Sequence, residues 1–95
     1  MAKGDVVSGV FTAVADAAVV SIQPAAGVEW CILNIWYESS VELYYSDGTN
    51  DILFDSDTGG GIWMGRLPVT NSLYIKVKNI SGAAQNIGYS GYQTK

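Results

Sequence analysis

The chain has 95 residues, a net charge of −4 at pH 7 and no histidine. A chain of this length forms one domain that buries only about two-thirds of its unfolded surface, so its stability is marginal. The acidic balance excludes a nucleic-acid-binding face, and no apolar run approaches the length of a membrane span. A single cysteine excludes an intrachain disulfide, which leaves oligomerisation as the means of stabilising so small a domain.

Hydrophobic residues make up 48% of the chain and charged residues only 15%. Part of the apolar surface is therefore expected to meet a partner. The charges are unevenly placed, since all acidic residues lie before residue 58 and four of the five basic residues lie after it. This asymmetry predicts charge pairing, either between strands of one sheet or between one subunit and the next.

Residues 1–17 are rich in alanine and valine and form an N-terminal arm or a first strand; residues 18–95 form the β-sandwich domain. The weak alternation of the first segment fits either a short helix or an extended arm, and the Val, Phe and Thr residues around Gly9 favour the extended form. Residues 18–23 predict a strand that ends at Pro24, because proline cannot continue a hydrogen-bonded ladder.

The stretch from Val28 to Ser46 is rich in aromatic and β-branched residues, which favour a half-buried pleated surface. We predict a central β-hairpin here, with strands at Glu29–Tyr37 and Val41–Ser46 joined by three polar residues. Strict alternation gives the first strand two apolar faces, which indicates coverage by a second sheet and by a subunit partner. The two faces are Trp30, Ile32 and Trp36 on one side, and Cys31, Leu33, Ile35 and Tyr37 on the other.

The second half of the chain alternates short strands with turn signals. Strands are predicted at residues 51–55, 62–67, 73–79 and 87–92, with a corner at residues 68–72. In the clearest of them, Leu73, Ile75 and Val77 share the buried face and Tyr74, Lys76 and Lys78 the wet one. Seven or eight such strands predict an all-β fold, a small antiparallel β-sandwich of jelly-roll or Greek-key type with an extended N-terminal arm.

No catalytic residue and no cofactor site is predicted, and we expect no enzymatic activity. No histidine is present to serve as a general base. Cys31 lies between Trp30 and Ile32, an apolar environment that favours a buried structural cysteine over a nucleophile. The glycines at 59–61 lack the Lys-Ser/Thr pair of a phosphate-binding loop. Paired carboxylates among Glu29, Glu38 and Glu42 would need a deep cleft, for which the domain has little room.

Two groups of side chains suggest binding instead. Asp55-Ser-Asp57-Thr-Gly59 resembles the start of a calcium loop but lacks the distal bidentate glutamate, so solvated turn aspartates are the preferred interpretation and no metal site is predicted. Aromatic side chains offer a platform for sugar rings, although core packing and a subunit interface account for them more simply. These are Trp36, Tyr44, Tyr45 and Trp63.

Several segments follow one another in a recognisable order. They are Gln23-Pro-Ala-Ala-Gly27-Val-Glu-Trp30, Val41-Glu-Leu-Tyr44 with Asp47-Gly48, Val69-Thr-Asn71 before Tyr74-Ile-Lys-Val-Lys-Asn79, and the closing Ile87-Gly-Tyr89. In this order they resemble small virion proteins of tailed bacteriophages, the capsid decoration (cement) proteins and related β-sandwich modules. The resemblance covers the chain from about residue 20 onward and is a pattern of strands and turns.

The resemblance implies a structural virion protein that is assembled in the host cytoplasm and located on the capsid surface. Its partners would be the major capsid protein and itself, as a homotrimer over capsid junctions, with no nucleic acid and no membrane. The residues expected at the protein interface are Phe11, Trp36, Tyr44, Trp63, Arg66 and Tyr92. The alternative function is a phage tail or head-fibre component with an aromatic glycan-binding face.

Overall fold

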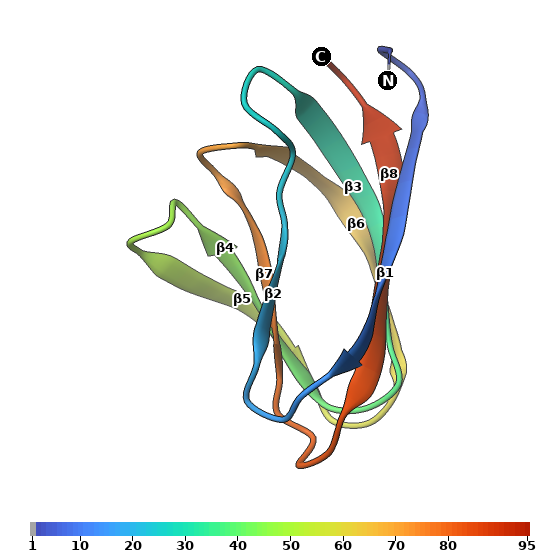
Figure 1. Cartoon of the computed structure of the whole chain (residues 1–95), viewed down its shortest axis with the longest axis vertical. Coiled ribbons are helices and arrows are strands. Elements are labelled where there is room, and N and C mark those ends of the chain that lie inside the picture. The colour runs from blue at the N-terminus through green and yellow to red at the C-terminus, as the bar shows by residue number, and fades with distance from the viewer. Residues whose placement is uncertain (1) are drawn as a thin grey trace.

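The computed structural model describes residues 2–95, which form eight strands and no helix. The strands are β1 (Val6–Val14), β2 (Val19–Ile22), β3 (Glu29–Tyr37), β4 (Val41–Ser46), β5 (Asp51–Asp57), β6 (Gly61–Thr70), β7 (Tyr74–Asn79) and β8 (Gln85–Gln93). They make two antiparallel four-stranded sheets, which we name sheet A (order β1-β8-β3-β6) and sheet B (order β2-β7-β4-β5). Figure 1 shows the two sheets facing each other, with both chain ends at one end of the molecule. The predicted all-β sandwich is confirmed.

The strand pairing identifies the sandwich as a jelly roll. The first strand pairs with the last, the second with the seventh, the third with the sixth and the fourth with the fifth. The four pairs thus form one long antiparallel ribbon, whose closed end is the β4–β5 turn. The ribbon folds over so that β3 also pairs with β8 and β4 also pairs with β7. This arrangement decides between the two sandwich topologies that the sequence left open.

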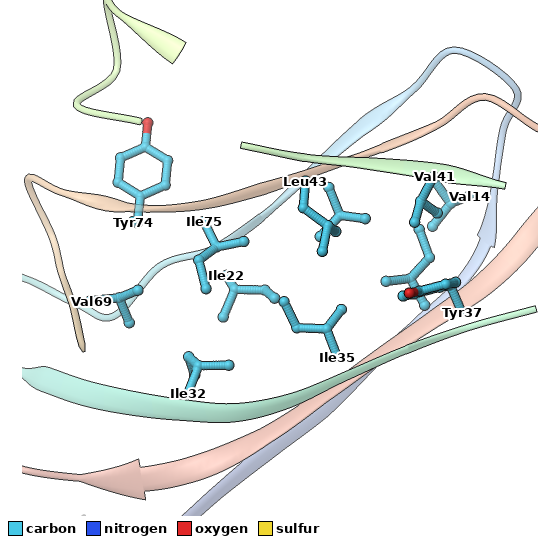
Figure 2. Close-up of a cluster of buried hydrophobic side chains, with 12 residues drawn as sticks. Val14, Ile22, Ile32, Ile35, Tyr37, Val41, Leu43, Val69, Tyr74 and Ile75 are labelled. Atoms are coloured by element: carbon cyan, nitrogen blue, oxygen red, sulfur yellow. The ribbon is translucent and has the colours of Figure 1, made fainter. Parts of the chain in front are cut away.

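The core lies between the sheets and consists almost entirely of aliphatic side chains. Figure 2 shows Ile32 and Ile35 of sheet A pointing toward Ile22, Leu43 and Ile75 of sheet B. Partly buried rings of Phe11, Trp30, Phe54, Trp63 and Tyr89 pack around this cluster. Because no helix is present in the described residues, none is long or apolar enough to cross a membrane.

The predicted central hairpin is wrong in its pairing, although both of its strands are present with the expected bounds. β3 lies between β8 and β6 in sheet A, whereas β4 lies between β7 and β5 in sheet B. Residues 38–40 therefore cross from one sheet to the other and do not form a hairpin turn. The aromatic and β-branched composition that suggested a hairpin reflects two central strands, each flanked on both sides, whose inner faces meet across the core.

The predicted alternation along β3 is also wrong, because a β-bulge interrupts it. Pairing with both neighbours shifts between Ile32 and Asn34. Leu33 is an extra residue against β8, whereas β6 places both Gly65 and Arg66 opposite it. A bulge of one residue exchanges the faces of everything beyond it. Ile32 and Ile35 consequently share the inner face, and Trp36 turns to the outside.

Several other strands differ from the prediction, and among them β5 continues to Asp57 and β8 begins at Gln85, each two residues beyond the expected end. β6 continues through Pro68, where a corner was expected, and proline is tolerated because β6 is an edge strand with one side free of ladder bonds. On β7 the predicted faces are correct for Ile75 and Lys76, but Leu73 precedes the strand and is exposed. Tyr74 is buried although it was placed on the wet face. Its hydroxyl lies under the β4–β5 turn, 3.5 Å from where a Cβ on Gly48 would stand.

Candidate interaction surface

The outer face of sheet B carries charged and polar side chains, together with the exposed Val19 and Leu53. Its rows place Lys78 beside Glu42 and Lys76 beside Tyr44. The Lys76 ammonium lies 3.2 Å from a carboxylate oxygen of Asp51. Hydrogen bonding from Ser46 and then from Lys76 lowers the pKa of Asp51 below its ordinary value. Acidic and basic parts of the sequence thus pair here within one chain, which is one of the two alternatives that the charge asymmetry left open.

The outer face of sheet A is different, because its three central rows carry no charge. From one end to the other the rows are Val6–Tyr92–Cys31–Pro68, Ser8–Ser90–Asn34–Met64 and Val10–Gly88–Trp36–Ile62. Val6, Val10 and Met64 are each about two-thirds to three-quarters exposed, at 75%, 67% and 71%, and Trp36 and Ile62 are exposed as well. We call these rows the uncharged face.

One end of the uncharged face bears a tyrosine beside the only cysteine. Tyr92 stands opposite Cys31 in the ladder, and the cysteine is buried as predicted. A hydrogen bond with the Cys31 side chain raises the pKa of Tyr92, while the nearby positive charge of Arg66 lowers it. Arg66 itself is exposed and sits where β6 bulges opposite Leu33.

A groove of about 320 Å³ opens at the other end of the uncharged face, lined by Val10, Trp36, Glu38, Asn86 and Gly88 among others. The two polar side chains are fixed by backbone hydrogen bonds. The backbone N–H of Asn86 donates to Oε1 of Glu38 at 2.6 Å, and the N–H of Ala13 donates to Oδ1 of Asn86 at 2.9 Å. Among residues 2–95, the second carboxylate oxygen of Glu38 and the amide N–H groups of Asn86 make no hydrogen bond within the chain.

Gly88 lies at the floor of this groove, and no close contact within the chain requires a glycine at this position. A Cβ added there would make only ordinary contacts, the nearest being 3.4 Å from the carbonyl oxygen of Gly9. At Gly9, Gly65 and Gly91 the same atom would come within 3.0 Å of a neighbour. A glycine inside a strand costs stability and often marks the close approach of a ligand or another backbone.

The structure places the six predicted interface residues in three different surroundings. Trp36, Arg66 and Tyr92 lie on or beside the uncharged face. Tyr44 lies on the outer face of sheet B, where its hydroxyl donates to Glu42 at 2.6 Å. The rings of Phe11 and Trp63 turn inward, against Tyr89 and Phe54 respectively.

The sequence prediction missed four exposed apolar residues of this face. They are Val6, Val10, Ile62 and Met64. A signal for them was present, because each alternates along its strand with an inward-facing residue such as Val7 or Trp63.

Aspartates of β5 and of the β4–β5 turn are engaged with their own chain. Oδ2 of Asp57 accepts a hydrogen bond from the Tyr37 hydroxyl at 2.9 Å, and Asp55 is exposed. Oδ1 of Asp47 accepts from the backbone N–H groups of Thr49 and Asn50. Within residues 2–95 no three potential ligands among Cys, Asp and Glu converge on one point.

The Tyr37–Asp57 contact predicts a loss of stability at high pH. Burial first, and then the hydrogen bond with Asp57, raise the pKa of Tyr37 from 10.0 to about 12. Between those values the unfolded chain releases the Tyr37 proton while the folded chain retains it, so stability falls as pH rises through this range. In urea denaturation at about pH 9 and about pH 11, we expect Tyr37→Phe to show a smaller fall than the natural chain. An equal fall in both would contradict this.

The uncharged face offers a partner apolar contact area, and hydrogen-bonding groups lie at its margin. Its exposed apolar side chains lie on both sides of the polar row Ser8–Ser90–Asn34, and exposed apolar patches rimmed by polar residues mark interaction sites on soluble domains. Trp, Tyr, Met and Arg are the residues enriched in the cores of protein interfaces, and charged residues other than Arg are depleted there. No family model matches the chain, and no curated protein matches its sequence.

Proposed function

We propose that this chain is a structural virion protein that binds the outer surface of a bacteriophage capsid and reinforces contacts between major capsid protein subunits. The observation that carries the proposal is the uncharged face of sheet A, which exposes apolar side chains and no charge along its three rows, whereas the opposite face carries several charges. The bacteriophage resemblance supplies the identity of the partner.

The two outer faces suit a protein that lies flat on a shell. The uncharged face would meet the capsid, with Trp36 and Tyr92 as its aromatic anchors. The charged face of sheet B, which already pairs Lys76 with Asp51, would then point to solvent. Many identical copies bound at once convert modest single contacts into high avidity, so a domain of 95 residues is sufficient for reinforcement.

The copy number of the chain in purified virions tests this proposal. Quantitative mass spectrometry would report the chain relative to the major capsid protein. A ratio of similar order supports a shell decoration protein. A handful of copies would place the chain in the tail or a fibre, and its absence from particles would overturn the virion proposal.

Binding to shells that lack the chain tests the role of the uncharged face. We expect Trp36→Ser to weaken binding by roughly 30-fold, the loss typical of an interface anchor residue. Ile52→Ser is the matched control, because Ile52 is also exposed but belongs to β5 in sheet B. Equal effects of the two variants would mean that another surface makes the contact.

A second candidate function, a glycan-binding tail or head-fibre component, is favoured by the groove beside Trp36. An exposed indole can stack on a sugar ring, while Glu38 and Asn86 hold one free acceptor and free donors in fixed positions. A glycan array probed with the natural chain and with Gly88→Val separates the two candidates. The added side chain fills the groove floor, so it abolishes glycan signals if the groove is the site. No glycan signal from the natural chain would exclude this candidate.

A further inference from the structure

The two sheets have four edge strands, and three of them are protected against pairing with another chain. An edge strand presents unpaired N–H and C=O groups to which a further strand can add. β6 contains Pro68 and a bulge, β5 carries three aspartates and a bulge, and β2 has only four residues. Proline, charge, bulges and short length are the recognised means of blocking an edge.

Over residues 6–11, β1 is the edge without such protection, because its pairing with β8 shifts only beyond this stretch, between Phe11 and Val14. Its pairing with β8 is unbroken from Val6 to Phe11, and none of these six residues is charged or a proline. Val6, Ser8 and Val10 all point outward from sheet A and are exposed. Figure 1 shows β1 along the margin of the molecule beside β8. The chain therefore leaves one regular, uncharged edge open.

We propose that a second copy of this chain pairs antiparallel with β1 through residues 6–10, about a two-fold axis at Ser8. In this register Val6 of one copy faces Val10 of the other, and the two Ser8 residues face each other. The segment Val6-Val-Ser-Gly-Val10 is self-complementary in that sense, as a two-fold interface requires. Asp5 falls opposite Phe11 of the other copy, so no like charges meet.

The pairing has a consequence for the uncharged face. Two copies of sheet A become one eight-stranded sheet, and their outer rows, which end at Val6 and Val10, become continuous. The dimer thereby offers a partner twice the contact surface of a single copy, and both halves belong to one rigid body. This inference goes beyond the proposed function and applies to either candidate. It also differs from the trimer that the resemblance implies, so the molar mass in solution distinguishes them.

Charge substitutions at the two valines test the pairing and its register together. Light scattering of the natural chain should give twice the mass of 10.1 kDa. Val6→Lys with Val10→Lys places like charges opposite each other and should raise the dimer dissociation constant at least about tenfold. Val6→Glu with Val10→Lys places opposite charges there and should restore the dimer. Both sites are exposed, so unchanged thermal unfolding at a concentration where the natural chain is monomeric verifies that the variants fold.

A cysteine at the proposed axis gives an independent readout. Facing residues in antiparallel strands lie about 4.5–5.5 Å apart at Cα, within the range that a disulfide spans. Ser8→Cys should therefore cross-link on mild oxidation, whereas Ser21→Cys, exposed on the edge strand β2, should not. A monomer or trimer by light scattering, failure of the opposite-charge pair to restore the dimer, or equal cross-linking of the two cysteine variants would each overturn the proposal.

Discussion

Gly91→Ala is expected to destabilise the domain by about 3 kcal/mol and to lower its melting temperature by at least about 12 °C. A Cβ on Gly91 would overlap the carbonyl oxygen of Cys31 and stand 2.9 Å from its carbonyl carbon. Those atoms belong to the backbone of β3, the central strand that pairs with β8, so no side-chain rotation relieves the clash. β3 and β8 would have to separate at a point where sheet A has strands on both sides.

Gly88→Ala is the matched control in the same strand, three residues away. Its Cβ meets nothing closer than 3.4 Å, and its φ is not in the left-handed region. The variant should be within about 0.5 kcal/mol of the natural chain or slightly more stable, since alanine loses less backbone entropy on folding than glycine. Thermal unfolding followed by circular dichroism measures both variants. Equal melting temperatures for the two would show that the Cys31 carbonyl is not a barrier.

Local composition predicted where the strands of this fold lie much better than which strands pair with each other. Aromatic and β-branched residues predicted both ends of β3 and of β4 correctly, because a half-buried pleated surface needs those side chains whichever strand lies alongside. The choice of partner depends on how the whole ribbon folds back on itself, and no residue between Glu38 and Ser40 encodes it. The short polar connection suits a crossing between sheets as well as it suits a hairpin.

The candidate surface was harder to predict for a related reason. A single extra residue, Leu33, exchanges the faces of β3, and nothing in its neighbours marks it as a bulge. Trp36 was predicted as a contact residue from an alternation that the bulge invalidates, and the structure places it on the exposed outer face. Val6 and Met64 were missed because an exposed apolar residue and a buried one look alike in a sequence until the neighbouring strand is known.

Asn79→Ala should cost about 3 kcal/mol, because this fully buried side chain joins several segments at one end of the sandwich. Its amide nitrogen donates to the carbonyl oxygens of Val14 at 2.9 Å and Ala83 at 2.7 Å. Its oxygen accepts from the Ser81 backbone at 2.9 Å and from the Gln85 side chain at 2.8 Å. Truncation leaves these buried groups without partners, and an unsatisfied buried polar group costs more than the lost bond itself.

Asn71→Ala is the appropriate control, since the exposed Asn71 donates a single 3.1 Å hydrogen bond to the carbonyl oxygen of Pro24. Urea denaturation should show a loss below about 1 kcal/mol for this variant, with an unchanged slope. Gln85 extends the network, because its amide donates to the Ser40 carbonyl and its oxygen accepts from the Glu38 and Ser39 backbones. The double variant Asn79→Ala with Gln85→Ala should therefore lose less than the two single losses added together. Strict additivity would mean that the crossing between β3 and β4 is held independently of Asn79. A non-additive loss would instead make the polar cluster one unit that closes this end of the ribbon.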